Sequence, residues 1–413
     1  MKYLVLVPDG AADYELPALD GRTPLEAAHT PNMDRLAAEG QGGLAQMIPP
    51  SRQPGSDIGN LEIFGYDSTV HYTGRAPLEA ASMGIDLGPR DVAFRCNLIY
   101  SDGDTLVDYS AGHITTAEGR QALEDVAAAL AAPDIHFYPG VGYRHIMVYT
   151  GGPEGLVSHP PHDIMGQSVA GHLPSGEGAE RICDLMTRSE PVLAACPVNE
   201  RRRREGKSPA NAIWLWGAGR PLTLPSVADR YGLSAGVISA VDLVRGIGRC
   251  AGYEVIDVPG ITGYLDTNYE GKADHALTAL AAGTDLVYVH VEAPDEAGHS
   301  GDEKAKVTAL EDFDDRVVGR ILQGLKVLGE PCRVLLTPDH RTPIPKRTHT
   351  REPVPFALWG AGVAADGMHS YSERAAEAGS LRVPHGHELM ARLLAQPGRA
   401  ETNGRTDGVR EGR

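Results

Sequence analysis

The sequence of 413 residues predicts an α/β fold in which a mainly parallel sheet is flanked by helices and carries an inserted, smaller α+β domain. Two observations lead to this prediction. Short, continuous apolar runs, which are typical of parallel strands buried on both faces, alternate with longer segments of helical periodicity. Between residues 91 and 207 this alternation changes to pairs of shorter strands broken by proline and glycine. A second domain is therefore expected within the first.

The first domain is expected to be discontinuous, covering residues 1–90 and 208–397. Its buried parallel strands are predicted at residues 2–7, 235–240, 285–291 and 333–337, and its connecting helices at 240–251, 272–282 and 304–328. In residues 91–207 the order strand, strand, helix, strand, strand, helix predicts the inserted domain. The last stretch, 398–413, is polar and rich in Gly and Arg, so a flexible tail is expected there.

The overall charge narrows the classes of partner. Lys and Arg number 38 and Asp and Glu number 55, which gives a formal net charge of −17 at pH 7. A chain this acidic is not expected to bind nucleic acid or an anionic membrane surface. Its five cysteines form no CxxC pair, which indicates reduced thiols and a cytoplasmic protein. The first strand begins at Lys2 and no apolar run reaches about 18 residues, so neither a signal peptide nor a membrane span is expected.

Three aspartates stand at the ends of predicted strands. They are Asp9, Asp295 and Asp339. Because the carboxyl ends of parallel strands meet at one edge of a sheet, distant parts of the chain would bring these carboxylates together. An aspartate after a strand often only caps the next helix or turn. Three histidines nearby, His299, His340 and His349, extend the group to the ligands of two divalent metal ions.

A serine completes this group. Ser56 follows the turn Pro54-Gly55 and opens a segment with the apolar spacing of a helix start. A serine in this place commonly serves as an N-cap. The same place suits a nucleophile, because the free N–H groups and the dipole of a helix start favour an arriving phosphate. A metal ion on the serine oxygen would lower the pKa of the hydroxyl without a histidine base.

Several blocks of the sequence now show a family resemblance. The metal and nucleophile blocks of cofactor-independent phosphoglycerate mutases are similar to residues 7–10 (VPDG), 55–60 (GSDIGN), 292–299 (EAPDEAGH), 337–340 (TPDH), 349–350 (HT) and 353–355 (PVP). The chain length and the blocks 23–34 (TPLEAAHTPNMD) and 74–80 (GRAPLEA) resemble the shorter, archaeal-type branch, which belongs to the alkaline phosphatase superfamily. The resemblance extends in order over about residues 1 to 395.

The resemblance implies an alkaline-phosphatase-like core and a specific division of ligands. One metal ion is expected at Asp9, Ser56, Asp339 and His340, and the other at Asp295, His299 and His349. Manganese is the metal that the family favours, while zinc and magnesium remain open because carboxylate and imidazole donors also accept them. The implied activity is the interconversion of 2-phosphoglycerate and 3-phosphoglycerate, a step of glycolysis, through a phosphoserine on Ser56.

The inserted domain is expected to grip the small phosphorylated acid. Arg95, His113, Arg144 and His145 lie in short strand-like blocks, and Arg202 and Lys207 lie in the basic stretch NERRRREGKSPAN. Arginine and lysine donors bind phosphate and carboxylate groups, and Arg144 and Lys207 are preferred for this role. Most of the run 201–204 is equally explained as a solvated helix surface. His162 is a further candidate, in a proline-rich loop.

Other functions remain open from the sequence. The branch includes proteins assigned as homoserine kinases, and the blocks around His340 and His349 suit either group. A mutase or hydrolase acting on a phosphonate or another phospho-acid is a third enzyme hypothesis. A binding or scaffolding protein without activity would have lost Ser56 or one of the metal ligands, and none is lost. The oligomeric state is also open.

Overall fold

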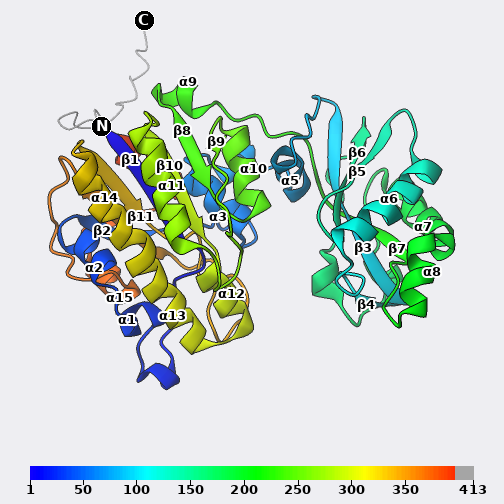
Figure 1. Ribbon diagram of the computed structural model, residues 1–413, viewed down its shortest axis with the longest axis horizontal. Helices are drawn as coiled ribbons and strands as arrows, with labels where there is room; N and C mark the ends of the chain where they lie inside the picture. The colour runs from blue at the N-terminus through cyan, green and yellow to red at the C-terminus, as the bar shows by residue number, and fades with distance from the viewer. Residues whose placement is uncertain (396–413) are drawn as a thin grey trace, which may run out of the picture.

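The computed structural model describes residues 1–395, which form a larger and a smaller lobe (Figure 1). The larger lobe contains an eight-stranded sheet with the strand order β13-β2-β12-β11-β1-β10-β8-β9. These strands are β1 (Lys2–Pro8), β2 (Gln41–Ala45), β8 (Ala235–Ile238), β9 (Glu254–Val255), β10 (Leu286–Val291), β11 (Cys332–Leu336), β12 (Val354–Gly360) and β13 (Leu381–Val383). The tail expected at 398–413 lies outside the described residues.

The pairing confirms the mainly parallel sheet. β1 pairs in parallel with β10 on one side and with β11 on the other, and β8 and β9 continue the same direction. Within the described chain, β12 alone runs against its neighbours in this sheet. The carboxyl ends of β1, β10 and β11 therefore lie side by side, and the segments that follow them share one edge of the sheet.

Helices cover both faces of this sheet. Along β1, Leu4 and Leu6 pack into the core on one face, while Val5 and Val7 pack into the core on the other. Burial on both faces explains why the strand is a continuous apolar run. The larger lobe contains α1 (Pro24–Ala27), α2 (Pro31–Ala38), α3 (Ser56–Ile63), α4 (Ser68–His71), α9 (Val227–Tyr231), α10 (Asp242–Cys250), α11 (Tyr269–Ala281), α12 (Ala293–Ser300), α13 (Glu303–Phe313), α14 (Arg320–Leu328), α15 (Glu373–Ala378) and α16 (Glu388–Leu394). A π-helical turn joins α13 to α14.

The smaller lobe is built on an antiparallel sheet. Its strands are β3 (Asp91–Asp102), β4 (Thr105–Asp108), β5 (Ile135–Tyr138), β6 (Arg144–Thr150) and β7 (Ala212–Gly219), and its helices are α6 (Thr116–Leu130), α7 (Ala179–Ala195) and α8 (Pro197–Arg204). β3 lies between β6 and β7. The strand β7 follows the boundary expected at residue 207, and it pairs with β3 in this sheet. No described helix is long and apolar enough to cross a membrane.

Helix α5 (Arg75–Ser82) lies between the two lobes (Figure 1). It packs against α10 of the larger lobe and against β3 and β7 of the smaller one. Gly74, the residue before it, has φ of 155°. A Cβ at Gly74 would lie 2.3 Å from the carbonyl oxygen of Ala218 in β7, so only glycine permits this approach. The close contact fixes the start of α5 against the smaller sheet.

A buried ion pair ties the loop after β1 to α13. Lys306 and Asp13 both have fully buried side chains, and Lys306 Nζ lies 2.8 Å from Asp13 Oδ2. Lys306 also donates to the carbonyl of Thr342, and the backbone N–H of Ile344 donates to Asp13. The pair therefore holds the chain that follows β11, and each charge depends on the other for compensation.

We expect Lys306→Met to lower the free energy of unfolding by about 3 to 5 kcal/mol, because it leaves the Asp13 carboxylate buried without its partner. Lys304→Met is the matched control, since Lys304 is an exposed lysine of the same helix. Urea unfolding of both variants measures the effect. A loss below about 1 kcal/mol for Lys306→Met would contradict this account of the buried pair.

Candidate active site

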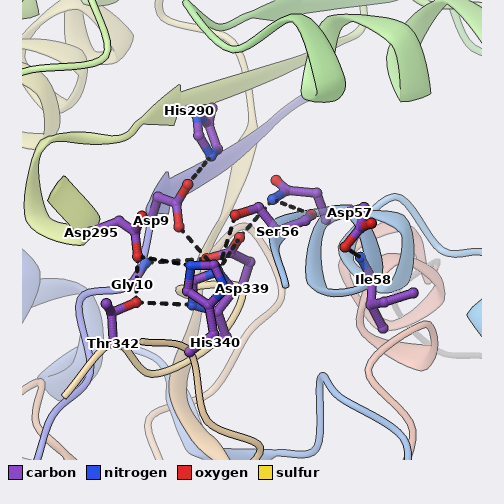
Figure 2. Close-up of polar contacts among 12 residues, drawn as sticks. Asp9, Gly10, Ser56, Asp57, Ile58, His290, Asp295, Asp339, His340 and Thr342 are labelled. Atoms are coloured by element: carbon purple, nitrogen blue, oxygen red, sulfur yellow. Dashed lines mark hydrogen bonds and ion pairs between the residues drawn. The ribbon is translucent and has the colours of Figure 1, made fainter. Parts of the chain in front are cut away.

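The first group of predicted metal ligands gathers at the carboxyl edge of the large sheet. Asp9 directly follows β1, and Asp339 and His340 follow β11. Ligand atoms of these three residues lie within 4.8 Å of one another. His340 Nε2 is 3.5 Å from Asp9 Oδ1 and 3.4 Å from Asp339 Oδ2. The parallel pairing of β1 with β11 produces this convergence. Figure 2 shows Asp9, Asp339 and His340 gathered together.

Ser56 lies beside this group at the start of α3. Its Oγ is 3.1 Å from His340 Nε2 (Figure 2). Gly55 occupies the N-cap position and Ser56 is the first helical residue, so the capping alternative is wrong. Asn60, one turn along α3, donates to Asp339 Oδ2 at 2.7 Å and to the Ser56 carbonyl at 2.9 Å. These bonds lock the helix start against the carboxylate group.

The second group of predicted ligands converges in the same way. Asp295 and His299 are separated by one turn of α12, and His349 comes from the loop before β12. His299 Nε2 lies 3.2 Å from Asp295 Oδ2 and 2.9 Å from His349 Nε2. His299 Nδ1 is 3.0 Å from the carbonyl oxygen of Arg347. A hydrogen bond from Nδ1 to this carbonyl leaves the Nε2 lone pair facing the group.

Thr342 connects the two groups. Its hydroxyl donates to Asp295 Oδ1 and lies 3.2 Å from His340 Nδ1. His290 lies on the other side of Asp9, with its Nε2 3.0 Å from Asp9 Oδ2 (Figure 2). The sequence analysis missed both residues. Thr342 stands two residues after His340, but nothing in the sequence reveals its contact with Asp295.

The buried carboxylates of the first group favour a cation that compensates their charge. Burial raises the pKa of Asp9 well above the usual range, and the neighbouring Asp339 and Asp295 carboxylates raise this pKa further. Both oxygens of Asp9 are buried, and neither accepts a hydrogen bond of good geometry from the described residues. Burial also lowers the pKa of His340 well below its usual value, which keeps the imidazole neutral and able to act as a ligand.

The second group is balanced differently. Burial alone would raise the pKa of Asp295, but hydrogen bonds with His299 and His349 outweigh it and hold that pKa well below the usual range. The same bond to Asp295 raises the pKa of His299 to about 9. A metal ion in this place would take over the role of the His299 proton. Both groups combine carboxylate and imidazole donors, which fit a divalent metal such as manganese or zinc.

A third cluster of side chains has the spacing of metal donors, but its oxygens already accept hydrogen bonds within the protein. Glu62, Asp67 and His387 also place ligand atoms within 4.8 Å of one another. However, Glu62 Oε1 accepts from the backbone N–H and the hydroxyl of Ser68, and Oε2 accepts from the backbone N–H of His387. His387 Nδ1 lies 2.8 Å from the same Oε2. These bonds fasten the start of α16 to α3, so the cluster has a structural role.

A cleft of about 910 Å³ opens beside the second group and is lined by both lobes. His299 and His349 line it from the larger lobe. His162 and Trp216 line it from the smaller lobe, and Arg75 lines it at the start of α5. His162, an open candidate in the sequence, therefore faces the cleft. Arg75 and Trp216 were not predicted, although Arg75 belongs to the block GRAPLEA.

The six residues predicted to grip the substrate lie outside the lining of this cleft. Arg202 is buried and bonds to Glu118 at 2.8 Å and to the Ser208 carbonyl at 2.9 Å. His145 is buried, and its Nδ1 accepts from the backbone N–H of Gly140. Hydrogen bonds within the protein therefore account for the burial of both side chains.

The other four predicted residues differ in exposure. Lys207 is exposed and pairs with Glu205 at 2.7 Å, and His113 and Arg144 are exposed on the smaller lobe. Arg95 is buried on β3 behind the cleft wall, with its guanidinium 4.3 Å from the Trp216 ring centre. Of the six, Arg95 is the residue whose side chain stacks on a residue of the cleft lining, and it does so from behind.

Comparison with known proteins identifies the family. The model of the 2,3-bisphosphoglycerate-independent phosphoglycerate mutase family matches residues 37–199. A relative from Geobacter sulfurreducens, named a probable 2,3-bisphosphoglycerate-independent phosphoglycerate mutase, is 53% identical over 95% of this chain and 100% of its own. A mutase of the same name from Methanothrix thermoacetophila is 51% identical over 96% of this chain and 100% of its own. The chain therefore belongs to the 2,3-bisphosphoglycerate-independent phosphoglycerate mutase family.

Solved structures agree with this family. A protein from Pyrococcus horikoshii is 31% identical, has a TM-score of 0.83, and is matched over 98% of this chain and 99% of its own. The cofactor-independent phosphoglycerate mutase of Thermoplasma acidophilum is 27% identical, with a TM-score of 0.66 over 95% of this chain and 99% of its own. The predicted α/β fold and family resemblance are thereby confirmed. The match extends across both lobes.

Proposed function

We propose that this protein interconverts 2-phosphoglycerate and 3-phosphoglycerate through a phosphoserine on Ser56, without 2,3-bisphosphoglycerate. The observation that carries the proposal is the position of Ser56 Oγ, 3.1 Å from His340 Nε2 at the first residue of a helix. The free N–H groups of that helix start favour a phosphoryl group on the serine. The names of relatives about half identical to this chain support the same reaction.

Two divalent metal ions, preferably manganese, belong to the proposal. Asp9, Asp339 and His340 with Ser56 would hold one, and Asp295, His299 and His349 would hold the other. Bound there, the ions would lower the pKa of the serine hydroxyl and offset the charge of the phosphoryl oxygens. The hard carboxylate donors mixed with three imidazoles suit manganese or zinc better than magnesium.

The chain's own residues then account for the two transfer steps. Ser56 Oγ loses its proton and attacks the phosphorus atom of one phosphoglycerate, the bond from phosphorus to the glycerate oxygen breaks, and that oxygen takes up a proton in exchange. The N–H groups at the start of α3 face the new phosphoserine. Glycerate turns within the cleft, and its other hydroxyl loses its proton and attacks phosphorus. The bond from phosphorus to Ser56 Oγ breaks, and Ser56 Oγ takes up a proton again. Water must stay out, since its attack on the phosphoserine would give glycerate and phosphate.

The smaller lobe completes the cleft in this scheme. We assign residues 91–219 to an inserted substrate domain, since β7 belongs to the sheet of that lobe. A cytoplasmic location is part of the proposal, and five cysteines without a disulfide support it.

The test of the proposed reaction is a direct substrate comparison. The purified protein, reloaded with manganese, is expected to convert 3-phosphoglycerate to 2-phosphoglycerate without added bisphosphoglycerate, as followed by phosphorus NMR. The same protein with ATP and homoserine is expected to form no phosphohomoserine. Transfer from ATP to homoserine with no mutase activity would replace the proposal with a kinase on the same scaffold.

A further inference from the structure

Arg75 is the arginine that α5 presents to the cleft between the lobes. Its side chain is 38% exposed, and its Nε donates to Glu79 Oε1 at 3.2 Å, one turn along the same helix. Within the described chain this is the guanidinium's one hydrogen bond, so its two terminal nitrogens keep their donors. The contact of Gly74 with β7 fixes the backbone from which the side chain extends.

Glu79 holds Arg75 in place and is shared with a second arginine. Its other oxygen, Oε2, lies 2.8 Å from Arg95 Nε, and both of these side chains are largely buried, at 12% and 6% exposure. Arg95 in turn stacks on Trp216, a residue of the cleft wall. Glu79 shares its one negative charge between two guanidiniums, and the positive charge that faces the cleft is that of Arg75. An anion is the ligand that this charge favours.

A second carboxylate that acts on Arg75 is Asp57, which also lines the cleft, and its oxygens already accept hydrogen bonds. Asp57, the residue after Ser56, accepts the Tyr72 hydroxyl at 2.5 Å on Oδ2 and its own helix's Ile58 N–H at 3.0 Å on Oδ1. In Figure 2 the Asp57 side chain points away from the metal-ligand group. Burial lowers the pKa of Arg75, but Glu79 and Asp57 outweigh burial and raise it. Arg75 therefore stays charged next to the nucleophile helix.

Two other arginines line the cleft, and both have different surroundings. Arg52 donates to the carbonyls of Ser68 at 2.7 Å and Thr69 at 3.2 Å, and it stacks on Tyr72. These contacts direct its donors toward the backbone of α4. Arg347 lies against Gly301 at the C-terminal end of α12, since a Cβ on Gly301 would come 2.5 Å from Arg347 Nε. Arg75 is the cleft arginine with a held side chain and uncommitted terminal donors.

The chemistry of the intermediate defines what this arginine would bind. Once the phosphoryl group is on Ser56, the remaining glycerate has a single charged group, its carboxylate. That carboxylate is also the one group that stays the same while the two hydroxyls exchange places. We propose that the Arg75 guanidinium binds the carboxylate of phosphoglycerate and of the glycerate intermediate, with Glu79 as its positioning residue. The planar fork of arginine matches a carboxylate in a bidentate manner. This inference rests on the proposed function.

Binding measurements in a non-reacting protein test the assignment. Ser56→Ala protein with manganese is titrated calorimetrically with 3-phosphoglycerate, with D-glycerate, and with glycerol 1-phosphate, which lacks the carboxylate. Adding Arg75→Met is expected to raise the Kd for 3-phosphoglycerate and for D-glycerate roughly tenfold to a hundredfold, as for the loss of other charge-assisted contacts. The Kd for glycerol 1-phosphate is expected to change by less than about threefold. Arg188→Met is the matched control, since Arg188 also pairs with an acid one turn away, on the exposed face of α7.

Kinetics of the protein with Ser56 intact give a second readout. If glycerate is retained by Arg75, Arg75→Met is expected to release glycerate and phosphate, so the ratio of hydrolysis to mutase product rises at least about tenfold. Arg75→Lys keeps the positive charge but loses the planar guanidinium. Its ratio of hydrolysis to mutase product is expected to lie between those of Arg75→Met and the parent protein. Glu79→Gln is expected to raise KM for 3-phosphoglycerate while the fold, followed by circular dichroism, is unchanged.

The outcomes separate the two proposals. If Arg75→Met weakens the binding of all three ligands equally, or of none, the carboxylate assignment is overturned while the proposed reaction stands. If Arg75→Met weakens the binding of glycerol 1-phosphate and 3-phosphoglycerate but leaves the binding of D-glycerate unchanged, Arg75 binds the phosphate group. That result also overturns the carboxylate assignment. If the Ser56→Ala parent binds none of the three ligands, the proposed function fails, and the inference about Arg75 fails with it.

Discussion

Ser56→Ala abolishes phosphoryl transfer, by at least about 10⁴-fold in kcat, if Ser56 carries the phosphoryl group. The reason is that the hydroxyl next to His340 is the only protein nucleophile in the proposed reaction. The fold is expected to survive, because Gly55 caps α3 and the helix start is held by Asn60. Initial rates of 2-phosphoglycerate formation check the loss of activity, and circular dichroism of the parent and the variant checks the fold.

Ser82→Ala is the matched control for this prediction. Ser82 ends α5, and its hydroxyl donates to Asp242 at 3.3 Å, away from both ligand groups. Its rate is expected to stay within about twofold of the parent rate, since surface changes away from the site have small effects. Turnover by Ser56→Ala at the rate of Ser82→Ala would exclude a phosphoserine at residue 56.

His349→Ala is expected to remove one of two bound metal ions and to lower kcat by about 10² to 10⁴-fold. The imidazole of His349 contributes one of three donors to the second group, with its Nε2 3.5 Å from Asp295 Oδ1. The first group lies on other strand ends and keeps its donors. Metal content by plasma mass spectrometry and initial rates with manganese measure the two effects together.

His369→Ala serves as the control, because His369 is exposed and belongs to neither ligand group. It is expected to keep both metal ions and the parent rate. Exhaustive chelation of the parent protein is expected to remove activity, and manganese is expected to restore it. Full activity in a metal-free sample would contradict the whole arrangement of ligands.

The convergence of the two donor groups was predictable because it depends on strand ends. Asp9, Asp295 and Asp339 each follow an apolar run, and the rule that parallel strands share a carboxyl edge brings them together without any knowledge of strand order. The spacing of Asp295 and His299 is one helical turn, which the sequence also states directly. Local pattern and one topological rule were therefore sufficient for this part of the site.

The substrate side of the cleft was not predictable in the same way. Arg202 stands in a run of basic residues that suggests an exposed phosphate site, but it is buried against Glu118, 84 positions away in the chain. Arg75 looks like an ordinary residue of a helix start. Its position in the cleft depends on how α5 packs between helix α10 and the smaller sheet, and its orientation depends on the charge of Arg95 across Glu79. Such long-range pairing leaves no periodic signal in the sequence.

The strand that follows the predicted domain boundary was hard to assign for a related reason. The sequence analysis expected residues 208 onward to belong to the core. The run that follows, Ala212–Gly219, is a buried apolar strand that suits either sheet. It pairs with β3, a partner more than 100 residues earlier. Strand pairing over such a distance is decided by side-chain packing, so the apolar pattern alone did not assign the strand.

The most direct test of the central claim is a single-turnover experiment with 3-phosphoglycerate that carries a radiolabelled phosphoryl group. The manganese-loaded protein is mixed in excess over substrate, quenched with acid at successive times, digested, and sequenced by mass spectrometry. We predict that label appears on Ser56 before it appears in 2-phosphoglycerate, and that it then declines as both phosphoglycerates reach equilibrium. Complete conversion to 2-phosphoglycerate with the label on another residue, or with no label on Ser56 at any time, would contradict the account.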